Sequence, residues 1–226
     1  MNNRLMNPSQ VKAARLAGFM FLLAFIVPTL NWAFVLSSFR DAENALNTAN
    51  NIMVNEFIFR LGLTVELFMS VSLLLLGWSL YRLLKPVNHS LALLALLLKS
   101  VEATLMAVTV LIPFIALQTY SSEHVQPPLG LIFNSHTAIT SIPMVFLGMD
   151  MILFSYLFFK SRYIPRLLAG FGILSFALIF IHACMYILVP EYATMSVNQI
   201  IFWTPSGLFE LIIGSWLLFK YPKSEV

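Results

Sequence analysis

A lysine and a glutamate lie three residues apart inside a long run of apolar residues. Lys99 and Glu102 fall near the middle of the segment 91–117, which has the length and composition of a membrane-spanning helix. If either charge faced lipid, its insertion would cost roughly 2.5–3.5 kcal/mol. Residues three apart share one face of a helix, so the two side chains can pair with each other. The spacing therefore predicts a buried ion pair on a face that other helices must cover.

Other ionisable residues fall inside the remaining apolar segments. At about 1.5 Å per residue from the helix ends that carry lysine and arginine, they lie between about 13 and 26 Å deep. Each lies on a stripe of polar or small residues at helical spacing, which favours contact between helices. We therefore expect one interior pocket that brings together six residues: Lys99, Glu102, Glu66, Asp150, Glu210 and His182.

Acids outnumber bases in this predicted pocket. Four ionised carboxylates against Lys99 would leave a net charge of −3, which a low-dielectric interior does not tolerate without compensation. Protons on some acids, protonated histidines, a bound cation or a water-filled cavity would each restore the balance. The pattern predicts a site that binds a small ligand or a cation, or that passes protons. The alternative for every one of these residues is a structural polar contact between helices.

The sequence contains no recognisable catalytic motif. It lacks HExxH, HxxxH, ExxH and GxSxG, and Cys184 is two residues from His182, on a different helix face. A site of Glu66, Glu102 and His182 would suit a metal ion, but no residue is assigned as catalytic and no metal or cofactor is identified. We favour a function without catalysis. The alternatives are a membrane-embedded enzyme that acts on lipid through a metal or acid–base centre, and a structural or accessory subunit.

Composition indicates an integral membrane protein. The 226 residues are 59% hydrophobic and 10% charged, and the mean hydropathy is +0.85, whereas soluble domains carry about 25% charged residues. The net charge of +3 comes from basic residues at the ends of apolar segments, which predicts a lipid bilayer rather than nucleic acid as the partner. The single cysteine excludes an internal disulfide.

The apolar segments predict an all-α fold, a single bundle of six transmembrane helices over residues 1–226. The length leaves no room for a separate soluble domain. The first apolar segment is too long for a signal peptide and is expected to be retained. Residues 37–56 form the one sizeable polar loop, in which apolar residues at helical spacing predict a short helix at the membrane surface. The predicted spans are residues 14–36, 57–84, 90–117, 131–159, 164–189 and 199–219.

Basic residues are distributed unevenly between the two sides of this predicted bundle. Arg40 and Arg60 fall on one side, and ten lysines and arginines fall on the other. Because cytoplasmic loops carry the excess of positive charge, both termini are expected to be cytoplasmic. The ten residues are Arg4, Lys12, Arg15, Arg82, Lys85, Lys160, Arg162, Arg166, Lys220 and Lys223.

Several motifs resemble a family of bacterial multi-pass membrane proteins that carries only a "domain of unknown function" label. They are FRLG at 59–62, LYRLLKPVN at 80–88, the segment 91–103 with its lysine and glutamate, RYIPR at 162–166 and PxGxxE at 205–210. The resemblance covers nearly the whole chain and implies a six-helix protein of the bacterial inner (plasma) membrane, with no activity attached. The family often has an aspartate after the histidine of the fourth span, whereas Thr137 follows His136 here.

Overall fold

The computed structural model describes residues 7–120, 129–189, 192 and 197–220, and within these ranges the chain forms helices and no strands. Six helices are long and apolar enough to cross a membrane, which confirms the predicted all-α membrane bundle. Arg4, Lys223 and most of the predicted loops at 118–130 and 191–198 lie outside the described residues. The six helices are α1 (Pro8–Phe34), α3 (Glu56–Leu84), α4 (His89–Tyr120), α6 (His136–Ser161), α7 (Arg166–Leu188) and α8 (Val197–Phe219).

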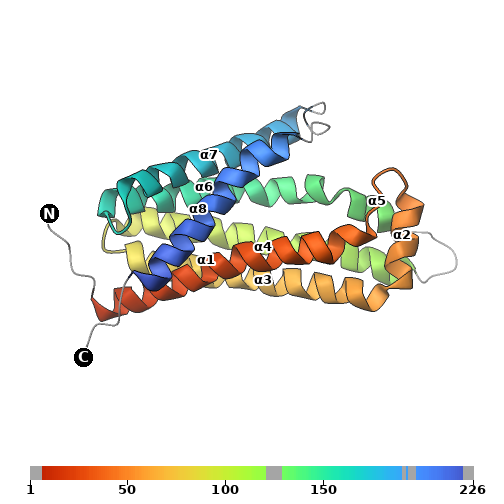
Figure 1. Cartoon of the computed structure of the whole chain (residues 1–226), viewed down its shortest axis with the longest axis horizontal. Coiled ribbons are helices and arrows are strands. Elements are labelled where there is room, and N and C mark those ends of the chain that lie inside the picture. The colour runs from red at the N-terminus through yellow and green to blue at the C-terminus, as the bar shows by residue number, and fades with distance from the viewer. Residues whose placement is uncertain (1–6, 121–128, 190–191, 193–196, 221–226) are drawn as a thin grey trace.

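The six long helices form a closed ring in which each helix packs against the next. The order around the ring is α1, α3, α4, α6, α7 and α8, and α8 packs back against α1. The start of α1 and the end of α8 lie at one end of the bundle, where the α3–α4 and α6–α7 hairpins also turn (Figure 1). We call this the basic end, and the opposite end the distal end. The described basic residues at the basic end are Lys12, Arg15, Arg82, Lys85, Lys160, Arg162, Arg166 and Lys220.

Helix α8 runs diagonally across the bundle and packs on α1 (Figure 1). The two helices meet at Gly18 and Gly214. A Cβ atom added to Gly18 would lie 2.7 Å from the carbonyl oxygen of Gly214 and 2.6 Å from the backbone nitrogen of Leu218. Glycine is therefore required for the two backbones to meet so closely. This contact holds the stretch of α8 around residue 210 against the rest of the ring.

A small cap of short helices covers the distal end. It consists of η1 (Leu36–Phe39), α2 (Ala45–Val54) and α5 (Leu129–Asn134), which pack on one apolar cluster with α3. Helix α2 confirms the short helix predicted within residues 37–56.

The fourth span differs from its prediction of 131–159, because residues 129–134 form the separate helix α5 and α6 begins at His136. Hydrogen bonds tie this segment to the cap. The Asn134 side chain donates to the carbonyl oxygen of Asp41 (2.7 Å) and accepts from the hydroxyl of Thr48 (3.2 Å). Gly130 lies directly against the backbone of Ala45, where a Cβ would clash. The first turn of the predicted span thus belongs to the cap and not to the ring.

Candidate functional site

The Lys99 side chain of α4 joins two carboxylates in the interior of the ring. Its Nζ atom donates to Oε2 of Glu102 at 2.6 Å and lies 2.9 Å from Oδ1 of Asp150 on α6. The three side chains are only 1%, 2% and 0% exposed. The ion pair predicted from the spacing of Lys99 and Glu102 is confirmed, and Asp150 extends it to a neighbouring helix.

The carboxylate of Asp150 is incompletely satisfied. Lys99 is its charge partner, yet neither Asp150 oxygen accepts a hydrogen bond of normal geometry from the part of the chain that the structure describes. A buried ionised carboxylate normally needs both a counter-charge and several hydrogen bonds. Asp150 has the counter-charge of Lys99 at 2.9 Å and no further donor among the described residues, so its ionised form depends on this single contact.

Glu210 of α8 brings a third carboxyl group within electrostatic range of this group. It lies close enough to Lys99 and Glu102 to interact with both electrostatically. Unlike them it retains partial exposure. The residues around it on the same helix face are buried against the rest of the ring; they are Ser206, Gly207, Ile213 and Gly214. Lys99, Glu102, Asp150 and Glu210 are called the interior cluster from here on.

Glu66 has a different partner. Its Oε1 atom accepts a hydrogen bond of 2.7 Å from the Asn31 side chain of α1, which also donates to the carbonyl oxygen of Gly62 at 3.1 Å. This contact joins α1 to α3. Sequence reasoning missed Asn31, although a lone asparagine inside the first apolar segment was a usable signal, because polar side chains in membrane helices usually bond across helices.

His182 also lies apart from the interior cluster. Its Nδ1 atom is 2.7 Å from the hydroxyl of Tyr192, and its ring stacks on Phe202 with a centroid distance of 5.1 Å. Tyr192 follows the membrane-spanning part of α7, and burial raises the pKa of its hydroxyl. The structure therefore brings together four of the six residues expected in one pocket, and it gives Glu66 and His182 partners of their own.

His136 stacks on an aromatic residue of α1. The ring centroids of Trp32 and His136 are 4.3 Å apart with an interplanar angle of 26°. The Trp32 ring is partly buried and packs against the apolar cluster beneath the distal cap.

The hypothesis of a metal centre built from Glu66, Glu102 and His182 is wrong. Among the described residues, no three His, Cys, Asp or Glu side chains are placed to share one metal ion. The three residues instead bond to Asn31, Lys99 and Tyr192, respectively. The chemistry that the interior cluster can offer is that of carboxyl groups and an ammonium group in close contact.

Comparison with known proteins gives one family. The model of a domain of unknown function (DUF4386) matches residues 16–220, which include most of α1 and the whole of the other five long helices. The match covers all six residues predicted for the site. Comparison with curated proteins and comparison with solved structures give no match.

Proposed function

We propose a proton-transfer function for this chain, which belongs to the DUF4386 family of domains of unknown function and takes no assigned activity from it. In this proposal the interior cluster takes up protons from one side of the membrane and releases them to the other. The observation that carries the proposal is that two carboxyl groups contact the single ammonium group of Lys99 and a third lies within electrostatic range of it.

Charge balance supports proton binding. If all four groups of the interior cluster were ionised, its net charge would be −2. Uncompensated charge in a low-dielectric interior costs several kcal/mol per ion, so neutral carboxylic acids are favoured over unpaired carboxylates. Asp150 has no donor other than Lys99 among the described residues, and protonation would remove the cost of its unmet hydrogen bonds.

The tight packing of the interior cluster favours a proton over a larger ligand. Lys99, Glu102 and Asp150 are almost completely enclosed by protein, which leaves little room for a small molecule between them. A metal ion would need three or more suitably placed ligands, and no such group occurs among the residues described above. A proton needs only a carboxylate oxygen.

Glu210 is the member through which protons would exchange with water. It combines partial exposure with electrostatic contact to Lys99 and Glu102. Intramembrane carboxyl groups that pair with one another and face a wet interior are typical of proton relays. We further propose that the protein lies in a bacterial inner (plasma) membrane with its basic end in the cytoplasm.

The test is proton movement in liposomes that contain the purified full-length protein and a pH-sensitive dye. With a membrane potential imposed by potassium and valinomycin, we expect protein-dependent acidification of the lumen. Glu210→Gln should reduce this rate to that of protein-free liposomes, because the amide keeps the shape of the side chain and cannot carry the proton. Glu43→Gln, an exposed acid of the distal cap, is the matched control and should leave the rate unchanged.

Two results would contradict this function. One is a wild-type rate equal to that of protein-free liposomes, and the other is a Glu210→Gln rate equal to that of wild type. Either would leave the interior cluster as a structural ion-pair network that fixes helix register, which is a known role of buried charges.

A further inference from the structure

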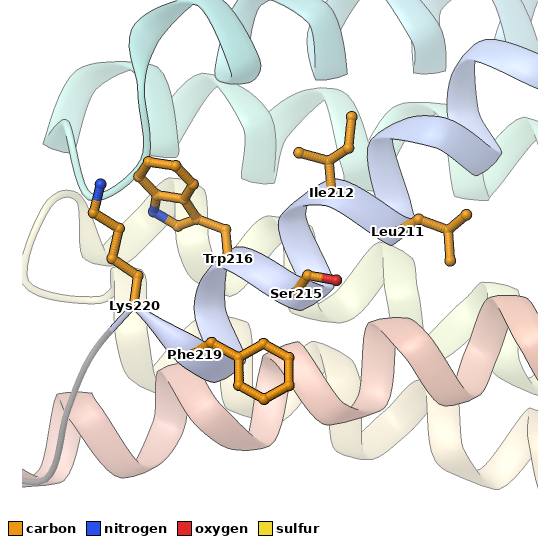
Figure 2. Close-up of a pocket in the computed structure, with 6 residues that line it drawn as sticks. All are labelled: Leu211, Ile212, Ser215, Trp216, Phe219 and Lys220. Atoms are coloured by element: carbon orange, nitrogen blue, oxygen red, sulfur yellow. The ribbon is translucent and has the colours of Figure 1, made fainter.

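A shallow apolar groove of about 620 Å³ runs along the outer face of α8 near the basic end (Figure 2). Its lining residues recur at helical spacing on one face: Leu211, Ile212, Ser215, Trp216, Phe219 and Lys220. About 12 Å of helix separates Leu211 from Phe219, close to the depth of one leaflet of the hydrocarbon core. The groove therefore begins at the membrane surface and ends near the bilayer centre.

A positive charge lies at the end of this groove that is nearest the membrane surface. Figure 2 shows the Lys220 side chain beside the Trp216 ring, and the Lys220 ammonium lies 3.7 Å from the ring centroid. Lys220 forms no ion pair within the described part of the chain. The tryptophan face holds the ammonium group at the groove mouth without neutralising it.

The surroundings of the groove are also positive. Three further cation–π pairs lie at the basic end: Arg82 with Trp78, Lys85 with Tyr81, and Arg166 with Phe159. No aspartate or glutamate among the residues described at this end offsets them. Such a belt of aromatic and basic residues lies at the headgroup level of a membrane and attracts anionic lipids.

We propose that this groove is a binding site for one anionic phospholipid of the leaflet at the basic end. An acyl chain lies along Leu211, Ile212 and Phe219, and the headgroup phosphate pairs with the Lys220 ammonium. The occupant follows from charge complementarity: an apolar groove of leaflet depth ends at a cation that has no counter-ion among the residues placed by the structure. The site is separate from the interior cluster and does not depend on proton transfer.

Fluorescence quenching by brominated lipids tests the proposal. The full-length protein would carry Trp32→Phe, Trp78→Phe and Trp203→Phe, so that Trp216 is its single tryptophan. It would be placed in bilayers that contain equal fractions of brominated phosphatidylglycerol or brominated phosphatidylcholine. We expect about a fivefold preference of the Trp216 site for phosphatidylglycerol, the factor that corresponds to about 1 kcal/mol for one basic residue near the surface.

The variant Lys220→Gln should lower that preference to about one. Lys85→Gln removes another aromatic-paired lysine of the basic end that does not line the groove, so it should lower the preference much less than Lys220→Gln does, which separates a specific site from general attraction. If the triple phenylalanine variant does not fold, native mass spectrometry of the wild-type chain and of the two lysine variants gives the same comparison. Equal affinity for the two lipids in the unmodified protein, or the same loss in both lysine variants, would overturn the proposal.

Discussion

Gly77 of α3 faces the Lys99 side chain of α4 so closely that a Cβ atom at position 77 would lie 2.8 Å from Lys99 Cγ and 3.2 Å from Lys99 Cβ. The missing side chain provides the space through which the lysine stem passes to reach Glu102 and Asp150. Gly77 is therefore a positioning residue for the interior cluster, although it makes no polar contact with it.

Valine at position 77 should destabilise the protein. The clash involves the first carbons of the lysine stem, which cannot move without shifting the ammonium group away from Asp150. Overpacking of this kind typically costs about 1–3 kcal/mol. We expect Gly77→Val to lower the free energy of unfolding by that amount, measured by denaturant titration in mixed micelles. The control is Gly170→Val on α7, where an added Cβ meets nothing within 4 Å. Equal losses of unfolding free energy in both variants would contradict the positioning role of Gly77.

Removal of the buried lysine should be costly, and neutralising its partners should restore stability. Lys99→Met leaves Glu102 and Asp150 without a counter-charge, a defect that typically costs about 3–5 kcal/mol. The triple variant Lys99→Met, Glu102→Gln, Asp150→Asn carries no unpaired charge and should recover most of that loss. The measurement is the free energy of unfolding in mixed micelles. A triple variant no more stable than Lys99→Met would show that packing, not charge, dominates at this position.

The Asn31 and Glu66 side chains should be energetically coupled in their contribution to stability. Asn31→Ala leaves the Glu66 carboxyl group and the Gly62 carbonyl without their donor, which we expect to cost about 1–3 kcal/mol. Replacing Glu66 with methionine should remove much of that penalty, so a double-mutant cycle should give a coupling energy above about 0.5 kcal/mol. Strictly additive effects of the two substitutions would argue against the contact.

The distal cap should loosen in acid through Asp41. The hydrogen bond from the Asn47 amide, helped by the backbone amides of Glu43 and Asn44 and opposed by slight burial, holds the pKa of Asp41 below its ordinary value of 3.8. A depressed pKa gives stability that is fully present above pH 3.8 and is lost as the pH falls through the folded-state value. Hydrogen exchange of the α2 amides, corrected for intrinsic rates, should therefore accelerate in that acidic range.

Asp41→Asn should remove this response to acid, whereas Glu43→Gln should keep it. Acceleration of α2 exchange with the same pH dependence in Asp41→Asn would assign the effect to another group of the cap.

The membrane fold could be predicted from the sequence because hydrocarbon imposes a strict rule on the chain. Each membrane span must be a long apolar helix, so hydropathy marks the spans directly. The break between α5 and α6 escaped this reasoning because it depends on the contacts of Asn134 with the distal cap, and hydropathy does not report tertiary hydrogen bonds.

Only the part of the site that lies within a single helix could be predicted from the sequence. The Lys99–Glu102 pair follows from residues three apart on one helix. Its link to Asp150 requires α4 and α6 to be neighbours, and the order of helices around a ring is set by packing between residues far apart in the chain. Depth estimates placed Glu66 and His182 in the same slab as Lys99. They carry no information on direction around the ring, and in the structure these two residues bond to Asn31 and Tyr192.

The most direct test of the proton-binding proposal is infrared difference spectroscopy of the protein in lipid, recorded as the buffer pH is varied. A carboxylic acid has a carbonyl stretching band that an ionised carboxylate lacks, and the band shifts on exchange into deuterium oxide. We predict such a band at neutral pH, with most of it lost in the variant Glu102→Gln, Asp150→Asn, Glu210→Gln and retained in Glu66→Gln. A spectrum without the band at neutral pH, or one that the triple variant leaves unchanged, would contradict proton binding by the interior cluster.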